Sequence, residues 1–272
     1  MAVIAIINRK GGSGKSTLAT HIAGYLASRG DEVMLGDVDR QQSSSMWLAL
    51  RPRDRPKIHG WNHDARNFAR PPAGTKHVVL DTPAGFQGLG LMKVALYADA
   101  ILVPTTSSLF DRDAAAEGIK ELRTLPRVSA AKCQIACVGL RIDARTRNGD
   151  VLEGWAEKLG VPYLGAIRQL QLYQRCVEQG LSLFDFPREK FSPYLQEWAK
   201  TTAWVDDLLS RPQPESRDLV RVTHRTLPEA EPAIGAGPTG THGGDTPRPA
   251  VTPSLAEGIP TFLRKLMPQL YK

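Results

Sequence analysis

The chain has few cysteines and no long apolar run, and each shortage excludes a class of protein. Its three cysteines, Cys133, Cys137 and Cys176, form neither an even disulfide framework nor a CxxC pair, so we expect a reducing compartment and no cysteine metal site. No apolar stretch reaches the ~18–20 residues of a membrane span. The N-terminus lacks the charged region and cleavage site of a secretory signal. We therefore do not expect a secreted, disulfide-stapled or integral-membrane protein.

The chain does contain enough apolar sequence for a sizeable core. Of its 272 residues, 42% are apolar and 23% are charged, which suits one large α/β domain or two small ones. The 35 lysines and arginines exceed the 28 acidic residues and give a net charge of +7. A basic excess of this size favours polyanionic partners without identifying them.

Composition changes near residue 210. Half of the 20 prolines lie beyond it, and residues 211–258 contain few aliphatic and no aromatic side chains. Such a segment cannot bury enough apolar surface to offset its chain entropy, so we predict a disordered Pro/Gly-rich linker there. Residues 259–272 regain apolar and basic side chains as a short C-terminal segment. We therefore expect the globular domain to span residues 1–210.

Within that domain, short apolar runs alternate with helix-like stretches. The predicted strands cover residues 2–7, 32–35, 77–80, 100–104 and 134–140. The predicted helices cover residues 16–29, 89–97, 111–124, 150–159 and 193–209. Strands that are apolar throughout are typical of a parallel sheet buried on both faces. We predict an α/β fold with a doubly wound, mostly parallel sheet, helices on both faces, and a ligand site beyond the carboxyl ends of the strands.

The strongest motif directly follows the first predicted strand and opens a helix. Residues 8–17 read N-R-K-G-G-S-G-K-S-T. The glycines let the backbone turn tightly and direct its N–H groups at phosphate oxygens, and the positive helix end strengthens the site. Lys15 is predicted to reach the β- and γ-phosphates of a nucleotide, and the Ser16 hydroxyl to bind Mg²⁺. The nucleotide-binding residues predicted from the loop itself are Gly11, Gly12, Ser13, Gly14, Lys15, Ser16 and Thr17.

This loop departs from the ordinary P-loop pattern, because Arg9 stands where G-x-x-x-x-G-K-[ST] has its first glycine. Instead, K-G-G-x-G-K-[ST] resembles the deviant Walker A motif of the ParA/MinD family of ATPases, and the resemblance extends over about residues 1–209. It implies a nucleotide-sandwich homodimer in which Lys10 reaches the phosphates of the partner subunit. A cation placed there would stabilise transition-state charge, as an arginine finger does.

Two aspartates follow the second predicted strand, in the run G-D-V-D-R-Q-Q over residues 36–42. Aspartates at i and i+2 at a strand end point the same way, so they can hold a hydrated Mg²⁺ and orient a water molecule. The run resembles the family's D-x-D-P-Q segment, although Arg40 replaces the proline. By that resemblance Asp39 would position the attacking water, and Asp37 would sit near the metal.

Asp81 ends the apolar strand that begins at His77, which is typical of a Walker B segment whose acid binds Mg²⁺ through water. The following residues 82–85, T-P-A-G, resemble the family's γ-phosphate-sensing loop. The predicted catalytic residues are Lys10, Lys15 and Asp39. The predicted metal ligands are Ser16, Asp37 and Asp81, and the predicted cofactors are ATP and Mg²⁺.

A polyanion site is predicted from basic residues in the second half of the domain. Residues 167–175 resemble a segment of small plasmid-partition ParA proteins, in which basic residues join a DNA-binding face. Joining two such faces in a dimer would raise DNA affinity, because affinity scales with the number of phosphates contacted. Membrane binding by residues 259–272 is not expected, because Pro260 and Pro268 leave room for only a short helix. The predicted DNA-binding residues are Arg141, Arg145, Arg147, Arg168 and Arg175.

These features predict a ParA-like Mg-ATPase in the cytoplasm, associated with the nucleoid. By the family resemblance, its ATP-bound dimer would bind DNA without sequence preference and position a plasmid, a chromosome or a subcellular cargo. A ParB-like or cargo adaptor would stimulate hydrolysis. The alternatives are a MinD-like membrane-surface ATPase regulating division or flagellar placement, a metabolic P-loop enzyme such as an amide ligase or an iron-protein relative, and a scaffold that hardly hydrolyses ATP.

Overall fold

The computed structural model describes residues 1–62, 75–143 and 145–211. The predicted C-terminal segment over 259–272 and all but the first residue of the predicted linker over 211–258 lie outside the described residues, so the predicted domain division stays a prediction. The strands are β1 (Ala2–Ile6), β2 (Val33–Asp37), β3 (Ile58–Asn62), β4 (His77–Asp81), β5 (Ala100–Thr105), β6 (Gln134–Ile142) and β7 (Tyr163–Arg168). The helices are α1 (Lys15–Ser28), α2 (Ser43–Leu50), α3 (Gly88–Tyr97), α4 (Leu109–Thr124), α5 (Pro126–Ser129), α6 (Asn148–Lys158), α7 (Gln171–Glu178) and α8 (Arg188–Ser210), with the 3-10 turn η1 (Leu183–Asp185).

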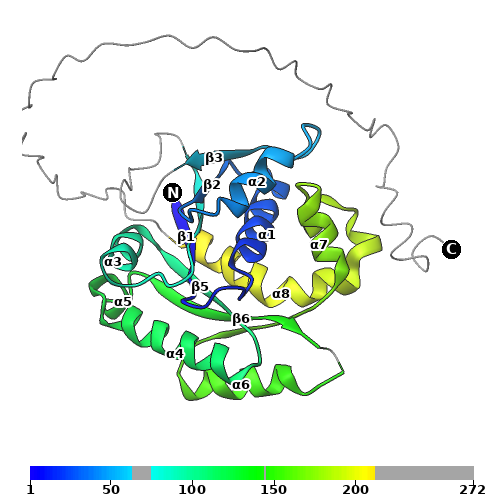
Figure 1. Ribbon diagram of the computed structural model, residues 1–272. Coiled ribbons are helices and arrows are strands. Elements are labelled where there is room, and N and C mark those ends of the chain that lie inside the picture. The colour runs from blue at the N-terminus through cyan, green and yellow to red at the C-terminus, as the bar shows by residue number, and fades with distance from the viewer. Residues whose placement is uncertain (63–74, 144, 212–272) are drawn as a thin grey trace, which may run out of the picture. The chain divides into compact units, whose positions relative to one another are not determined.

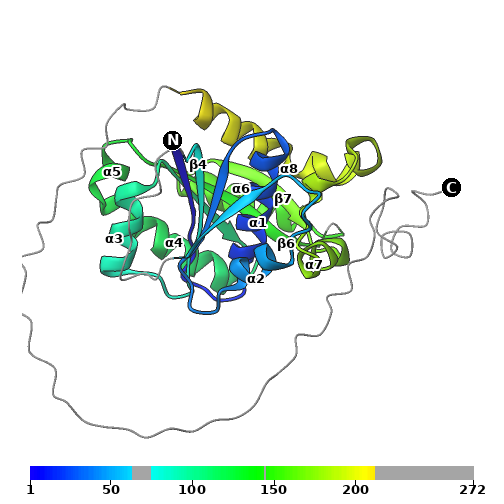
Figure 2. The ribbon, with the colours of Figure 1, turned by 90° about the horizontal axis from the view of Figure 1, so that it is seen from above.

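The strands of the described residues form one parallel sheet in the order β3-β2-β4-β1-β5-β6-β7. In Figure 1, α1, α2, α7 and α8 lie on one side of the sheet, and α3, α4, α5 and α6 lie on the other. The view in Figure 2 agrees, with α3 and α4 across the strands from α2 and α7. The predicted fold class, a doubly wound parallel sheet with helices on both faces, is therefore confirmed.

The central strands are buried on both faces, as their continuous apolar sequences predict. Every residue of β1, β4 and β5 is buried, because helices cover both sides of the sheet. The strand register brings Ile6 of β1 and Asp37 of β2 level with Asp81 of β4. The carboxyl ends of β2, β4 and β1 therefore meet at one edge, where the predicted motifs lie.

Helix α1 is buried on nearly its whole circumference rather than along one stripe. All ten residues from Leu18 to Ala27 are buried, because α1 packs between the sheet and η1 together with α7. Gly24 permits this close approach, since a Cβ at this position would lie 2.2 Å from the Ser182 hydroxyl oxygen. The helix that begins at the P-loop is thus part of the core.

The sequence predicted five of the strands and five of the helices, and it missed several shorter elements. β3, β7, α2 and α7 were absent from the prediction, because they have only five to eight residues each and at most three buried apolar side chains. Helix α8 begins at Arg188, five residues before the predicted start, and includes Pro193. This proline lies within the second turn, where only the hydrogen bond to residue 189 is lost.

Candidate functional site

The P-loop is anchored to the neighbouring strand by Asn8. The Asn8 side-chain nitrogen donates to the Pro104 carbonyl oxygen of β5 (2.7 Å), and its side-chain oxygen accepts from the Lys10 backbone N–H (2.9 Å). Asn8 is 2% exposed, so it fixes where the loop leaves the sheet. The sequence reasoning assigned no role to this residue, although an asparagine at a strand end before a loop is a signal for such local bonds.

Two glycines of the loop adopt backbone conformations that other residues rarely adopt. Gly12 has a φ of +75° and Gly14 a φ of +91°. A Cβ on Gly14 would also lie 2.6 Å from a methyl carbon of Leu140 at the end of β6. The loop therefore packs directly against β6. The hydroxyl of Ser13 is buried without a hydrogen-bond partner, as expected of a group that faces a ligand.

Lys15 points back into the loop. Its ammonium group donates to the Lys10 carbonyl oxygen (3.2 Å), and the side chain is 7% exposed. Burial lowers the pKa of Lys15, whereas Asp81 and Asp39 act in the opposite direction. A partly desolvated ammonium held between a peptide loop and two carboxylates is suited to bind phosphate oxygens. Ser16 and Thr17 follow it in the first turn of α1 and are half-buried.

Lys10 lies at the rim of the same site, with its side chain 41% exposed. Its ammonium group forms an ion pair with Asp111 in the first turn of α4, and Asp111 also accepts from the Thr106 hydroxyl. The ammonium is 5.9 Å from the centre of the Phe110 ring. Within one chain, Lys10 is therefore turned toward α4. The sequence reasoning did not identify Asp111 as its partner.

Asp81 is the most deeply buried acid of the site, with no exposed surface. Burial, together with the nearby charge of Asp37, raises the pKa of Asp81 to about 7, whereas the hydroxyls of Ser16 and Ser44 act to lower it. Neither of its carboxylate oxygens has a hydrogen bond of ordinary geometry. Two orphaned carboxylate oxygens beside a hydroxyl are a donor set that suits a hydrated Mg²⁺, so the predicted metal ligands Ser16 and Asp81 fit such an ion.

The two aspartates at and just after the end of β2 have different surroundings. Asp37 is buried at the end of β2 and accepts from the backbone N–H groups of Asp39 (3.1 Å) and Ser45 (2.9 Å), so it caps the start of α2. Asp39 is half-buried and accepts from the Gln41 backbone (3.0 Å). The negative charge of Asp39 acts to raise the pKa of Lys15, and that of Asp37 acts to raise the pKa of Asp81. Both aspartates therefore belong to the site. Their predicted metal and water roles stay predictions.

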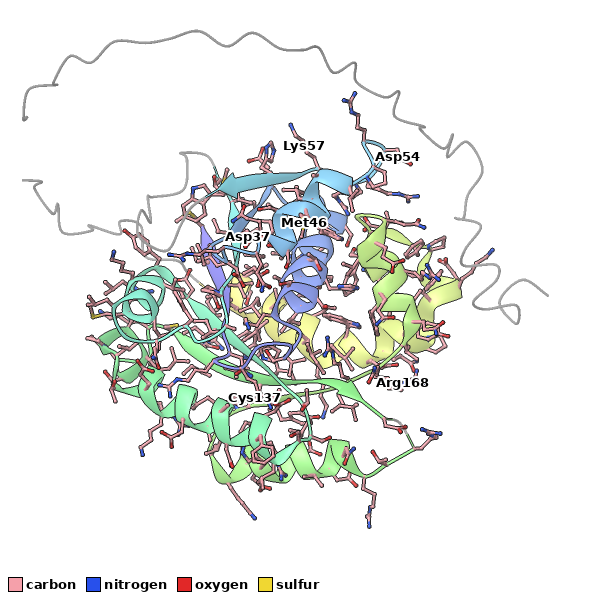
Figure 3. All side chains as sticks on the ribbon, in the orientation of Figure 1. Asp37, Met46, Asp54, Lys57, Cys137 and Arg168 are labelled. Carbon is pink, nitrogen blue, oxygen red and sulfur yellow. The ribbon has the colours of Figure 1, made fainter. Side chains whose placement is uncertain are left out.

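A cavity of about 540 Å³ opens beside the P-loop, between the ends of β6 and β7 and helix α7. Its wall includes Gly14 and Thr17 from the loop, and Arg141 and Arg168 from the strand ends. In Figure 3, Asp37 on β2 and Arg168 on β7 mark the two sides of the carboxyl edge between which the P-loop lies. The position and size of this cavity suit the nucleoside half of a bound nucleotide.

Three of the predicted DNA-binding arginines line two adjoining cavities that share Arg168: Arg141 lies in the wall of the first and Arg145 in the wall of the second. Arg168 donates to Glu197 (Nε to Oε1, 2.6 Å), whereas Arg141 is exposed with a left-handed backbone (φ +57°). Arg145 and Arg147 are exposed in the loop before α6, and Arg175 is exposed on α7. Each of these three also lies near an acid of its own segment, namely Asp143, Asp150 and Glu178 respectively. Their role in DNA binding stays a prediction.

Two further findings concern metals and membranes. Across the described ranges, no group of three or more histidine, cysteine or acidic side chains could hold a metal ion by itself. In the same ranges, no helix combines the length and apolar character needed to cross a bilayer.

Comparison with known proteins assigns the family. The sequence profile of the CobQ/CobB/MinD/ParA nucleotide binding domain matches residues 4–183. The maintenance of carboxysome distribution protein A of Halothiobacillus neapolitanus is 27% identical over 187 residues, which cover 66% of this chain and 86% of the relative. The protein of the same name from Gloeobacter kilaueensis is 28% identical, covering 68% and 84%.

Solved structures agree in fold. The MinC:MinD cell division complex of Aquifex aeolicus has a chain with a TM-score of 0.60 and 19% identity, covering 80% of this chain and 99% of that chain. The ATP complex of a Cyanothece McdA variant has a TM-score of 0.59 and 15% identity, covering 79% and 99%. With a matching family profile, a nucleotide loop and a buried Walker B acid, the chain belongs to the CobQ/CobB/MinD/ParA nucleotide-binding family and is an ATPase of the ParA/MinD type.

Proposed function

We propose that the protein is a positioning ATPase whose ATP-bound form is a sandwich dimer that binds DNA. The observation that carries this proposal is the placement of Lys10. It lies at the rim of the phosphate site, and the next residues on that rim, Leu109 and Phe110, are 58% and 74% exposed. A cation beside uncovered apolar side chains is suited to a second copy of the chain. The similarity to carboxysome distribution proteins supports a cargo-positioning role.

In the proposed reaction, water attacks the γ-phosphate of ATP. The backbone of residues 11–15 and Lys15 would bind the phosphates, and Ser16 and Asp81 would hold Mg²⁺, which neutralises phosphate charge when bound. Asp39 would orient the water. Lys10 would leave Asp111 and reach the phosphates of the partner subunit, so that the site is complete only in the dimer. Slow turnover by the monomer follows from this arrangement.

Dimerisation is tested by light scattering after size exclusion, with ATP, ADP and no nucleotide. The variant Asp39→Ala should bind ATP and dimerise without hydrolysing it, because only the orientation of water is lost. Lys10→Ala should bind ATP yet stay monomeric. A wild-type protein that stays monomeric in saturating ATP and Mg²⁺ with hydrolysis blocked would refute the sandwich dimer. Normal hydrolysis by Asp39→Ala would instead refute the role of that residue alone.

DNA binding is tested by titrating an arbitrary duplex in the three nucleotide states at several salt concentrations. Tight binding is expected only with ATP and should weaken steeply with salt, because phosphate contacts release counterions. Replacing the exposed Arg145, Arg147 and Arg175 by alanine should reduce the salt dependence. The control is Lys132→Ala, because Lys132 lies just before β6, at the amino ends of the strands. Equal DNA binding in all three nucleotide states would refute the ATP-dependent control of DNA binding. ATP-dependent binding to anionic vesicles instead of DNA would favour a membrane-surface ATPase.

A further inference from the structure

The residue that breaks the ordinary P-loop pattern makes a specific contact. Arg9 forms an ion pair with Glu121 of α4, and the two side chains are 28% and 26% exposed. The stem of Arg9 lies over Gly118 of the same helix, where an added Cβ would be 3.8 Å from the arginine Cγ. The P-loop is thereby fastened to α4 by a half-buried charge pair.

Both partners also hold the segment that follows Asp81. The Arg9 carbonyl oxygen accepts from the Gly85 N–H (2.6 Å). The Glu121 Oε1 atom accepts from the Gly88 N–H (2.9 Å), which is the first residue of α3. This second hydrogen bond is the largest cause of the lowered pKa of Glu121, and Arg9 adds to it. The four residues therefore close a ring of contacts that joins the P-loop, α4 and the start of α3.

Glycine lies at both ends of this segment. Gly85 has a φ of +68° and Gly88 a φ of +59°, which are backbone conformations that glycine adopts without strain. Between them Phe86 is buried, and Gly90 lets α3 lie on it, since a Cβ there would be 2.8 Å from the Phe86 ring. Residues 85–88 are thus held by the buried Phe86 ring and by the hydrogen bonds to Arg9 and Glu121.

We propose that Arg9 and Glu121 are positioning residues for ATP hydrolysis, holding residues 85–88 at a fixed place beside the P-loop. The proposal rests on the ATPase activity but not on DNA or adaptor binding. The nucleotide-facing backbone of residues 11–15 does not involve either side chain. Loss of the pair should therefore lower kcat without weakening ATP binding.

The test measures kcat and KM for ATP in four single variants. Glu121→Ala removes both the ion pair and the acceptor for Gly88, and its kcat should fall about tenfold with KM within about threefold of wild type. Glu121→Gln keeps an acceptor for Gly88, so its loss should be smaller. Arg9→Ala should resemble Glu121→Gln, and Arg9→Lys should recover part of the activity because the charge is restored.

Amide hydrogen exchange supplies a readout that does not depend on turnover. Exchange of residues 85–91 should quicken in Glu121→Ala and Arg9→Ala without nucleotide, while exchange in α1 stays unchanged. Arg127→Ala is the matched control. It removes another ion pair of low exposure, the one with Asp99, which lies at the amino end of β5 and away from the P-loop. This control can lower the melting temperature but should change neither kcat nor exchange of residues 85–91.

Three results would overturn the proposal. The first is an unchanged kcat per folded molecule in Glu121→Ala and Arg9→Ala. The second is a rise in KM at constant kcat, which would place Arg9 in ATP binding instead. The third is unchanged exchange of residues 85–91. A wild-type protein that fails to hydrolyse ATP would refute the ATPase function itself, whereas the exchange comparison would still test the restraint.

Discussion

At the scale of single residues, Asp81 links the metal site to the stability of the nucleotide-free protein. Its pKa is about 7 in the folded chain and 3.8 without burial. The folded state therefore binds more protons than the unfolded state between these values. The stability that this group contributes is fully present below about pH 4 and is lost as the pH rises toward 7.

Asp81→Asn should consequently be more stable than wild type without nucleotide at pH 8, by an amount on the order of a few kcal/mol. The advantage should shrink at pH 5, where wild-type Asp81 is protonated. With Mg-ATP, wild type should become more stable than Asp81→Asn, because the amide is a poor ligand for the metal. Melting temperatures at both pH values, with and without Mg-ATP, provide the measurement. An advantage that is equal at both pH values would contradict the buried charge.

The ion pair between Lys10 and Asp111 is expected to weaken dimerisation. Asp111→Asn removes the charge that holds Lys10 inside its own chain. The dimer dissociation constant in ATP should then fall several-fold, by about three- to tenfold for one partly exposed ion pair. Sedimentation with the background variant Asp39→Ala measures this without hydrolysis. Asp113 is an exposed acid on the same helix, and Asp113→Asn should leave the constant unchanged. Equal effects of the two variants would show that the Lys10–Asp111 ion pair does not oppose dimerisation.

The sequence predicted the positions of residues that form continuous motifs, and it missed the contacts that are made across the fold. Gly14, Lys15 and Asp81 lie where the motifs placed them, because a strand end and a helix start fix them locally. Asp111 and Glu121 were not predicted, since each meets the P-loop only through the packing of α4, about a hundred residues further along the chain. No spacing rule in one sequence reveals such a contact.

At the scale of elements, the close packing of α1 predicts an unusual cost for a small substitution. Alanine normally stabilises a helix interior relative to glycine by roughly 0.5–1 kcal/mol. At Gly24 the added methyl group would lie 2.2 Å from the oxygen of Ser182, which is fully buried and cannot move aside. Gly24→Ala should therefore destabilise the protein, by about 1–3 kcal/mol as other overpacked cores do.

Gly154 supplies the matched control, because it lies in α6 and a Cβ there meets nothing within 4 Å. Gly154→Ala should be neutral or stabilising. Urea denaturation of the two variants beside wild type separates helix propensity from packing. If Gly24→Ala proved as stable as wild type, α1 would not be packed as described.

Strand prediction succeeded where apolar runs were continuous and failed at the edges of the sheet. β1, β4 and β5 are buried throughout and were predicted from their apolar runs. β3 and β7 are edge strands with glycine and polar residues, so their pairing is set by neighbours rather than by their own sequence. Position in the sheet, which one sequence does not reveal, decided these assignments.

At the scale of the whole molecule, two buried histidines predict loss of stability in mild acid. Burial lowers the pKa of both His21 and His77 from 6.5 to about 4. The unfolded chain therefore binds more protons than the folded chain between these values. The stability present above about pH 6.5 is lost as the pH falls toward 4.

Denaturation at pH 7, 6 and 5 tests this slope, with Asp81→Asn as the background because Asp81 acts in the opposite direction. His21→Phe keeps a ring stacked on Trp198 and should flatten the slope. His59→Gln, at an exposed position, should leave it unchanged. A slope that persists in the double variant His21→Phe, His77→Gln would assign the acid sensitivity to other groups.

The enclosure of α1 ties the phosphate-binding loop to the core. Lys15 opens this helix, and its residues from Leu18 to Ala27 are buried against the sheet, η1 and α7. Because ligand and core share one rigid support, a tightly bound nucleotide should protect the whole domain from unfolding rather than its pocket alone.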